Sequence, residues 1–110
     1  MTVLVTGSAG FIGMHTSIRL LERGDTDVGI DNLNDYYDVR FVRGDIADPA
    51  ALAAAGRDAD RIIHLAAQAG VRYSLINPGA YIQTNLVGHF NVLELGRAMG
   101  DRLKMLVYAS

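Results

Sequence analysis

Cysteine and tryptophan are absent from the 110 residues of this chain, and only 7% of the residues are aromatic. Without cysteine there is no disulfide framework and no thiolate metal site, so nothing points to secretion. No apolar run approaches the ~20 residues that a helix needs to cross a bilayer, and no basic segment followed by an apolar core marks a signal peptide. These absences predict a cytoplasmic protein with no membrane partner.

Neither positive nor negative charge predominates in the chain. Ten Lys and Arg face 12 Asp and Glu, which gives a formal net charge of −2 without any like-charge block. A nucleic-acid partner is therefore not expected, because such partners select clustered basic residues. Half of the residues are apolar, which excludes a disordered tail and predicts one globular domain over residues 1–110.

Short β-branched runs alternate with helical patterns along the chain. Strands are expected at residues 2–6, 27–31, 41–42, 61–65 and 104–108, and helices at 11–23, 50–55 and 80–99. This alternation predicts an α/β fold of the Rossmann type, a doubly wound parallel sheet of about five strands in the order 3-2-1-4-5. Ligands of such sheets bind at the carboxyl ends of the strands, beside the switch point between strands 1 and 4.

Two local expectations follow from the apolar spacing. In the first helix, Phe11, Met14, Ile18 and Leu21 fall on one stripe, the spacing of an amphipathic helix. Between Asp31 and Phe41 the connection is too short for an ordinary crossover helix, so we expect no helix of two full turns between Asn32 and Arg40. One face over strands 2 and 3 is then thinly covered.

Three glycines with the spacing G-x-x-G-x-x-G follow the first strand directly, at Gly7, Gly10 and Gly13. Gly7 suits the tight turn, Gly10 allows a ligand to approach the backbone, and Gly13 allows the helix to pack near the strand. Free N–H groups at the start of the helix, together with its dipole, predict an anion site for a pyrophosphate.

Two aspartates extend this pattern. Asp31 ends the second strand, where a carboxylate accepts hydrogen bonds from an adenosine ribose and repels a 2′-phosphate, which favours NAD over NADP. Asp45 follows the third strand, and it either accepts from an adenine amine or closes an Asx-type turn.

Other residues have plainer interpretations. His15, His64 and His89 are scattered in the sequence without metal-ligand spacing, and His64 is expected to be a core histidine. Tyr36 and Tyr37 either stack on adenine or pack a loop. The long helix over 80–99 is apolar on more than one side. Either it simply covers strands 4 and 5, or its outer face also joins a dimer.

Several motifs together resemble the extended short-chain dehydrogenase/reductases, and in particular the NAD-dependent nucleotide-sugar epimerases and dehydratases. These motifs are residues 6–13, Asp31-Asn32, Gly44-Asp45, residues 64–67 and residues 107–110. Residues 31–38 and 68–74 resemble the UDP-glucuronate 4-epimerase branch. Relative to that family, the chain lacks at the Asp38–Val39 junction a stretch that normally carries a helix.

The resemblance implies NAD as the cofactor and assigns roles to individual residues. Phe11 and Ile12 contribute backbone N–H groups beside Gly7, Gly10 and Gly13. The remaining cofactor contacts fall on Asp31, Asn32, Asp45, Ile46, Leu65, Ala66 and Ala67, with Asn85 steadying the loop that follows the fourth strand. Arg72 either flanks a UDP-sugar substrate or is an ordinary exposed arginine.

The family reaction that the resemblance implies is epimerisation at C4 of UDP-glucuronate through a 4-keto sugar. It requires a Tyr-x-x-x-Lys pair, but the single lysine, Lys104, has Gly100 four residues before it. Ser110 begins the expected serine turn. We therefore expect residues 1–110 to be an inactive N-terminal NAD-binding segment of an enzyme that is a homodimer at full length, with the substrate domain absent. The alternatives are a non-catalytic NAD-sensing module and a sibling dehydratase or decarboxylase.

Overall fold

The computed structural model describes residues 1–31 and 40–109, with the side chains of Arg40 and Phe41 excepted. Five strands form one sheet: β1 (Thr2–Thr6), β2 (Thr26–Asp31), β3 (Arg40–Arg43), β4 (Arg61–His64) and β5 (Met105–Tyr108). All neighbouring pairs are parallel and the order is β3-β2-β1-β4-β5. The predicted Rossmann-type fold class and strand order are confirmed.

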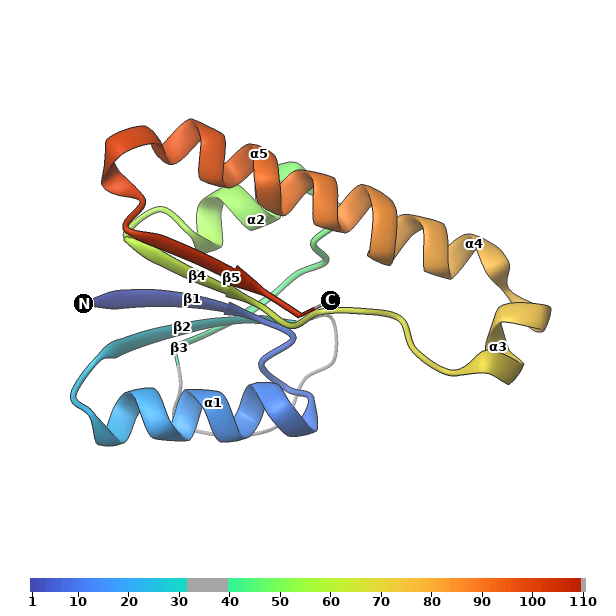
Figure 1. The fold of residues 1–110 in the computed structure, drawn as a ribbon, viewed down its shortest axis with the longest axis horizontal. Coiled ribbons are helices and arrows are strands. Elements are labelled where there is room, and N and C mark those ends of the chain that lie inside the picture. Colours follow the sequence, from blue (N-terminus) through green and yellow to red (C-terminus); the bar gives the residue numbers. More distant parts are fainter. Residues whose placement is uncertain (32–39, 110) are drawn as a thin grey trace.

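Helices cover the two faces of the sheet unequally (Figure 1). One face carries α1 (Phe11–Glu22), and the other carries α2 (Pro49–Ala55) and α5 (His89–Met99). The central strand β1 is buried from Val3 to Thr6, as a continuous apolar run predicts for a strand that is covered on both sides.

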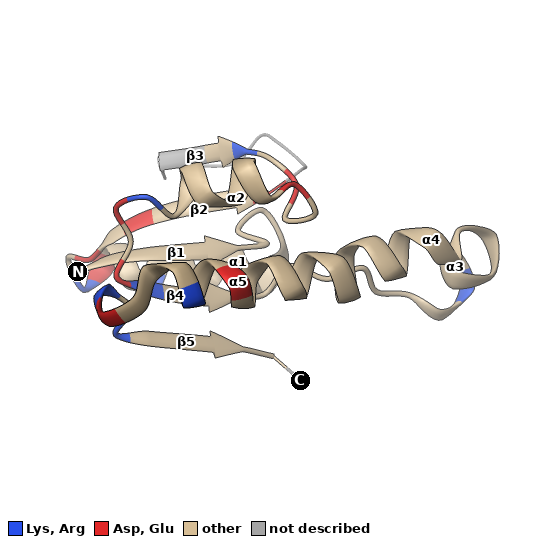
Figure 2. Ribbon diagram, turned by 90° about the horizontal axis from the view of Figure 1, so that it is seen from above, with Lys and Arg blue, Asp and Glu red and all other residues tan. Residues whose placement is uncertain are grey.

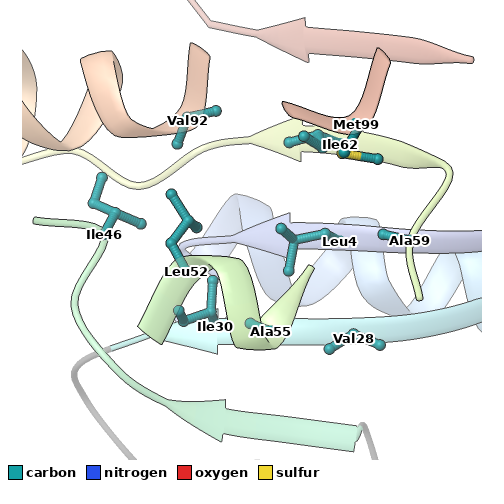
Figure 3. Close-up of a cluster of buried hydrophobic side chains, with 10 residues drawn as sticks. All are labelled: Leu4, Val28, Ile30, Ile46, Leu52, Ala55, Ala59, Ile62, Val92 and Met99. Carbon is teal, nitrogen blue, oxygen red and sulfur yellow. The ribbon is translucent and has the colours of Figure 1, made fainter. Parts of the chain in front are cut away.

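The principal core lies between the sheet and the α2/α5 layer (Figure 3). It joins Leu4, Ile30 and Ile62 of the strands to Leu52 of α2 and Val92 of α5. A smaller cluster of Val3, Val5 and Leu20 lies under α1.

The apolar stripe of α1 is not the face that packs on the sheet. Phe11, Ile18 and Leu21 are exposed, and the buried residues of this helix are Gly13, Ser17 and Leu20. The cause is the close approach of the helix to the turn before it, because a Cβ on Gly13 would lie 2.0 Å from the Gly7 carbonyl oxygen. This approach turns the row of small residues toward the sheet and overrides the apolar pattern.

Helix ends follow their local signals. Gly24, at φ 85°, closes α1 with hydrogen bonds from Gly24 N to Leu21 O and from Asp25 N to Leu20 O, both 3.0 Å, which is a Schellman motif. The Asp48 side chain caps α2 by accepting from Ala50 N at 3.0 Å, and Pro49 occupies the first helical position, where its missing N–H is harmless.

The segment between β4 and β5 is more complex than the single helix expected over 80–99. It contains α3 (Val71–Ile76), α4 (Pro78–Tyr81), the π-helical segment η1 (Ile82–Gly88), α5 and the 3₁₀ turn η2 (Gly100–Arg102). The α3–α4 end extends beyond the sheet (Figure 1). The expected absence of a two-turn helix between Asn32 and Arg40, and the thin cover it implies, fall outside the described residues, as do Tyr36 and Tyr37.

Candidate cofactor cleft at the carboxyl ends of the strands

The glycine loop forms a tight turn between β1 and α1. Gly7 has φ 70°, and a Cβ added to it would lie 2.8 Å from Ala66 N. Gly10 N donates to Gly7 O at 3.0 Å. Gly7 and Gly13 are therefore required by packing within the chain, because no side chain fits at either position.

Gly10 differs from its two neighbours. Among the described residues, a Cβ at Gly10 would meet only the Gly7 carbonyl oxygen, at 3.3 Å, which a shift of a few tenths of an ångström would relieve, and Gly10 is exposed. Its φ of −75° is open to any residue. The packing of the chain therefore gives little reason for glycine at this position.

At the amino end of α1, the described residues supply no acceptor for the first N–H groups of the helix. The first bond within the helix runs from Met14 N to Gly10 O at 2.8 Å, so the N–H groups of Phe11, Ile12 and Gly13 precede it. Among the described residues no side chain caps this end. Such an end favours an anion through its free donors and its dipole.

A cleft of about 320 Å³ opens beside Gly10, at the carboxyl ends of the strands and next to the switch point between β1 and β4. The residues that line it come from the glycine loop, the ends of β2 and β3, the turn after β4, and η1: Gly7, Ala9, Gly10, Ile30, Asp31, Gly44, Asp45, Ile46, Leu65, Ala66, Ala67, Gln68 and Thr84. Lysine and arginine do not occur among these residues, so an anion in the cleft would be held by N–H groups.

Asp31 links the end of β2 to the glycine loop. Its Oδ2 accepts from Ala9 N at 3.1 Å, and its backbone oxygen accepts from Gly44 N at 3.0 Å. The carboxylate is thereby held at the wall of the cleft, beside the glycine loop.

Asp45 closes a turn, as one of its two interpretations predicted. Its Oδ1 accepts from Ala47 N at 2.9 Å, which is an Asx turn. The next residue, Ile46, is buried, and its carbonyl oxygen accepts from the Asn91 side chain at 2.9 Å. Helix α5 therefore anchors this rim of the cleft.

Asn85 of η1 holds the turn that follows β4. Its Oδ1 accepts from Gln68 N at 2.8 Å and its Nδ2 donates to Gln68 O at 3.0 Å. The pair of bonds fixes the end of residues 65–68, which form one wall of the cleft, against the long helical segment (Figure 1).

Some predicted site residues lie elsewhere. The side chains of Phe11 and Ile12 are 78% and 66% exposed and do not line the cleft, so only their backbone can take part. Arg72 lies in α3, exposed and away from the cleft lining. Asn32 and Ser110 fall outside the described residues.

Sequence reasoning missed five of the lining residues. All five immediately adjoin predicted positions in the chain: Ala9, Ile30, Gly44, Gln68, which follows Ala67, and Thr84 of η1, which precedes Asn85. The available signal was the neighbourhood of Asn85, since Thr84 precedes it in the chain.

Two of the three histidines, scattered in the sequence, are neighbours in space. The rings of His64 and His89 lie 5.3 Å apart between centroids, and His89 contacts Tyr108 edge-on at 4.9 Å. Burial, and then the charge of His89, lowers the pKa of His64 to about 4. His64 is thus buried and neutral near pH 7, and the described part of the chain contains no group of three side chains fit to hold a metal ion.

The model of the NAD dependent epimerase/dehydratase family matches residues 3–110. This chain belongs to that family. A probable UDP-glucuronate 4-epimerase of Rhizobium meliloti (strain 1021) is 44% identical over 128 aligned positions, which cover 100% of this chain and 38% of the relative. Because the alignment is longer than the chain, the relative carries residues that have no counterpart here.

Solved structures of family members show the same fold. That of the Thermus thermophilus UDP-glucose 4-epimerase in complex with NAD is 39% identical with a TM-score of 0.88, covering 100% of this chain and 37% of that one. That of the Bifidobacterium longum UDP-glucose 4-epimerase in complex with NAD⁺ and UDP is 30% identical with a TM-score of 0.83, again covering 100% and 37%. The chain thus spans under two fifths of the length of these relatives. Within the described residues, no helix is long and apolar enough to cross a membrane.

Proposed function

We propose that this chain forms the NAD-binding part of a nucleotide-sugar 4-epimerase that converts UDP-glucuronate to UDP-galacturonate. The observation that carries the proposal is the environment of Gly10. Unlike Gly7 and Gly13, it is not demanded by packing, yet it lies between the uncapped end of α1 and an open cleft. A bound pyrophosphate explains both features, because it needs close approach to the backbone and free N–H donors.

The other walls suit the remaining parts of a dinucleotide. The Asp31 carboxylate, with Asn32 beside it in sequence, would accept from the adenosine ribose, and Asp45 and Ile46 would border the adenine. Leu65, Ala66 and Ala67 would line the centre of the cofactor, on a turn that Asn85 holds through Gln68. The negative charge of Asp31 favours NAD over NADP by repelling a 2′-phosphate.

When bound, NAD supplies the hydride acceptor and donor for C4 of the sugar. What the residues of this chain do is bind and orient the cofactor, and Arg72 is proposed to meet the UDP-sugar. The sequence contains no Tyr-x-x-x-Lys pair to take the proton of the 4-hydroxyl. Because hydride loss without a base would leave a protonated carbonyl, we propose that residues 1–110 alone are inactive.

A homodimer is proposed for the full-length protein. The exposed outer row of the long helical segment consists of Ile82, Leu86, Phe90 and Leu93. Lys, Arg, Asp and Glu are absent from residues 73–93, and Figure 2 shows the same uncharged stretch along α4 and the first part of α5. An uncharged apolar row of this kind suits contact with a second copy.

Titration of the ¹⁵N-labelled chain with NAD, followed by NMR, tests the cofactor site. We expect the amide signals of Ala9, Gly10 and Ala66 to shift with NAD, and to shift less with NADP at the same concentration. In Gly10→Val the response to NAD should be lost, since the side chain overlaps the pyrophosphate, while the signals of the core remain dispersed. No amide shift at millimolar NAD would contradict the proposal.

The enzyme assignment has its own test. A coding sequence that continues past Ser110 into a Tyr-x-x-x-Lys supports the epimerase, and a complete reading frame without one favours the NAD-sensing module. Conversion of UDP-glucuronate by that longer product, rather than dehydration or decarboxylation, decides the reaction.

A further inference from the structure

The turn that follows β3 is tied to a helix that lies far away in the sequence. The carbonyl oxygen of Ile46 accepts from Asn91 Nδ2 of α5 at 2.9 Å, across 45 residues of chain, and Asn91 is only 8% exposed. The side chain of Ile46 is also buried, against Gly88, where an added Cβ would lie 2.5 Å from Ile46 Cδ1. The long helical segment therefore takes up both the carbonyl and the side chain of Ile46, which leaves its N–H group.

One peptide group of this turn is held at both of its ends. The carbonyl of Ile46 and the N–H of Ala47 belong to the same planar peptide. Asn91 Nδ2 donates to the oxygen of this peptide at 2.9 Å, and the N–H donates to Asp45 Oδ1 at 2.9 Å. The two bonds form a chain from α5 through the peptide to the carboxylate, in which each bond polarises the next. The place of the Asp45 carboxylate therefore depends on Asn91.

The unused polar groups of the turn are a donor and an acceptor in neighbouring residues. Within residues 1–31 and 40–109, Ile46 N donates to no acceptor and Asp45 Oδ2 accepts from no donor, and both residues line the cleft. Adenine presents the complement, an amine donor at C6 and an acceptor at the neighbouring ring nitrogen. Hypoxanthine presents the reverse, an oxygen at C6 and a ring N–H. The turn therefore matches adenine and opposes hypoxanthine at both positions.

The contribution of Asn91 is separable from the folding of the turn. Asp48 N donates to Asp45 O at 2.9 Å, and the Asp48 side chain caps α2, so these contacts remain without the Asn91 amide. Without that amide, the oxygen of Ile46 would lose its donor at a buried site, and the peptide between Ile46 and Ala47 would turn to find another. The carboxylate bonded to the same peptide would then move with it.

We propose that Asn91 is the positioning residue of base recognition, which holds the Ile46–Ala47 peptide and thereby places the Asp45 carboxylate and the Ile46 N–H to select adenine over hypoxanthine. This assignment deepens the proposed function and rests on it where it concerns the adenine of NAD. The hydrogen-bond chain itself is present in the ligand-free chain. The base then meets groups whose places are set before it binds, so less ordering is needed on binding.

The ratio of two dissociation constants tests the assignment, because a role in folding alone leaves that ratio unchanged. NMR titration of the ¹⁵N-labelled chain compares NAD with nicotinamide hypoxanthine dinucleotide. We expect the unchanged chain to prefer NAD about tenfold, the low end for a paired donor and acceptor. Asn91→Leu keeps the size of the side chain and removes the donor, so its preference should fall below about twofold. Equal weakening of both ligands would overturn the proposal, as would an unchanged chain that binds both alike.

Met99→Val is the matched control on the same helix. Met99 is buried in the principal core, at the opposite end of the cluster from Ile46 (Figure 3). This variant loses packing while Ile46 keeps its donor, so we expect it to lower stability and to retain the preference for NAD. A preference that falls in Met99→Val as far as in Asn91→Leu would show that it follows stability, and would overturn the assignment.

Two measurements without ligand keep the proposal falsifiable if neither dinucleotide binds or Asn91→Leu fails to fold. In the unchanged chain the side-chain amide of Asn91 should exchange slowly with solvent, and fast exchange would overturn the assignment. The Ala47 amide signal should move upfield in Asn91→Leu, because its bond to Asp45 weakens, and an unmoved signal would also overturn it. Absence of binding together with the moved Ala47 signal would refute the proposed function and leave the role of Asn91 in the turn supported.

Discussion

On the face of the sheet covered by α2 and α5, ten buried hydrophobic residues form one cluster, whereas on the α1 face the corresponding cluster in the described residues has three. Under α1 the helix contributes Gly13 and Ser17 in place of large apolar groups, and a groove of about 610 Å³ lies beside it over Ile63. The α1 face therefore buries fewer apolar side chains than the other face, and its helix lies close to the glycine loop. That approach carries the amino end of the helix to the ends of the strands, where the cleft is.

Each face also carries a buried titratable side chain. His64 faces α5, where it contacts His89, and Asp27 faces α1, where it meets Ser17. Burial favours the neutral form of both side chains, so it lowers the pKa of the histidine and raises the pKa of the aspartate. The two faces are thus expected to respond to pH in opposite directions.

Neighbouring isoleucines of β4 give the largest expected difference between the faces. Ile62 is fully buried in the larger cluster, and Ile63 is only partly buried on the α1 side. We expect Ile62→Ala to lower the free energy of unfolding by about 3–4 kcal/mol, and Ile63→Ala to lower it by about 1–2 kcal/mol. Urea unfolding measures both, and equal losses would show that the two faces contribute alike.

The difference between the α1 face and the α2/α5 face also bears on which parts of the fold can be predicted from the sequence. Strand order followed from the alternation of β-branched and helical segments. The apolar stripe of α1 does not reveal which side of the helix faces the sheet, because a close backbone approach between Gly13 and Gly7 decides the rotation of the helix. The π-helical turns of η1 were missed because tertiary packing sets them, with Gly88 pressed against Ile46.

At the cleft, the residues recognised from sequence are those with a motif of their own. Gly7, Gly10, Asp31 and Asp45 stand at fixed offsets from strand ends, so their meeting in space follows from the sheet order. Thr84 reaches the cleft from η1, and the sequence pattern does not predict the path of this segment. Thr6 Oγ1 lies 2.6 Å from His64 Nδ1. This contact was missed although both residues belong to recognised motifs, because it depends on the register that pairs Thr6 with His64 across β1 and β4.

The stability that the α5 face gains from neutral His64 is expected to be lost in acid. The unfolded chain binds a proton at the ordinary histidine pKa of 6.5, and the folded chain binds it only near pH 4, because burial and His89 lower the pKa of His64. The stability from neutral His64 is therefore full above pH 6.5 and is lost as the pH falls from 6.5 to about 4. We expect a loss of about 2 kcal/mol after allowance for solvent screening.

Urea unfolding at a series of pH values measures this loss, with His64→Asn as the control. The variant has no imidazole to protonate, so its stability should change less over the same range. Parallel curves for the two proteins would show that His64 is not the group responsible.

On the α1 face, the contribution of Asp27 to stability is expected to fall as the pH rises, by a smaller amount than the contribution of His64 falls in acid. Burial raises the pKa of Asp27 above 3.8, and the Ser17 hydroxyl offsets part of the shift. The folded chain therefore binds the proton more tightly than the unfolded chain. Stability from this group is present below pH 3.8 and is lost as the pH rises through the folded pKa.

Asp27→Asn removes that loss, because an amide is never ionised at this buried position. At neutral pH we expect the variant to be more stable by about 1 kcal/mol, while below pH 3.8 its advantage should vanish, because there the aspartate is already neutral. The exposed Asp58→Asn serves as the matched control and should change little at either pH. A gain at neutral pH that persists unchanged in acid would mean that Asp27→Asn acts through packing under α1, and the contrast in charge between the two faces would fail.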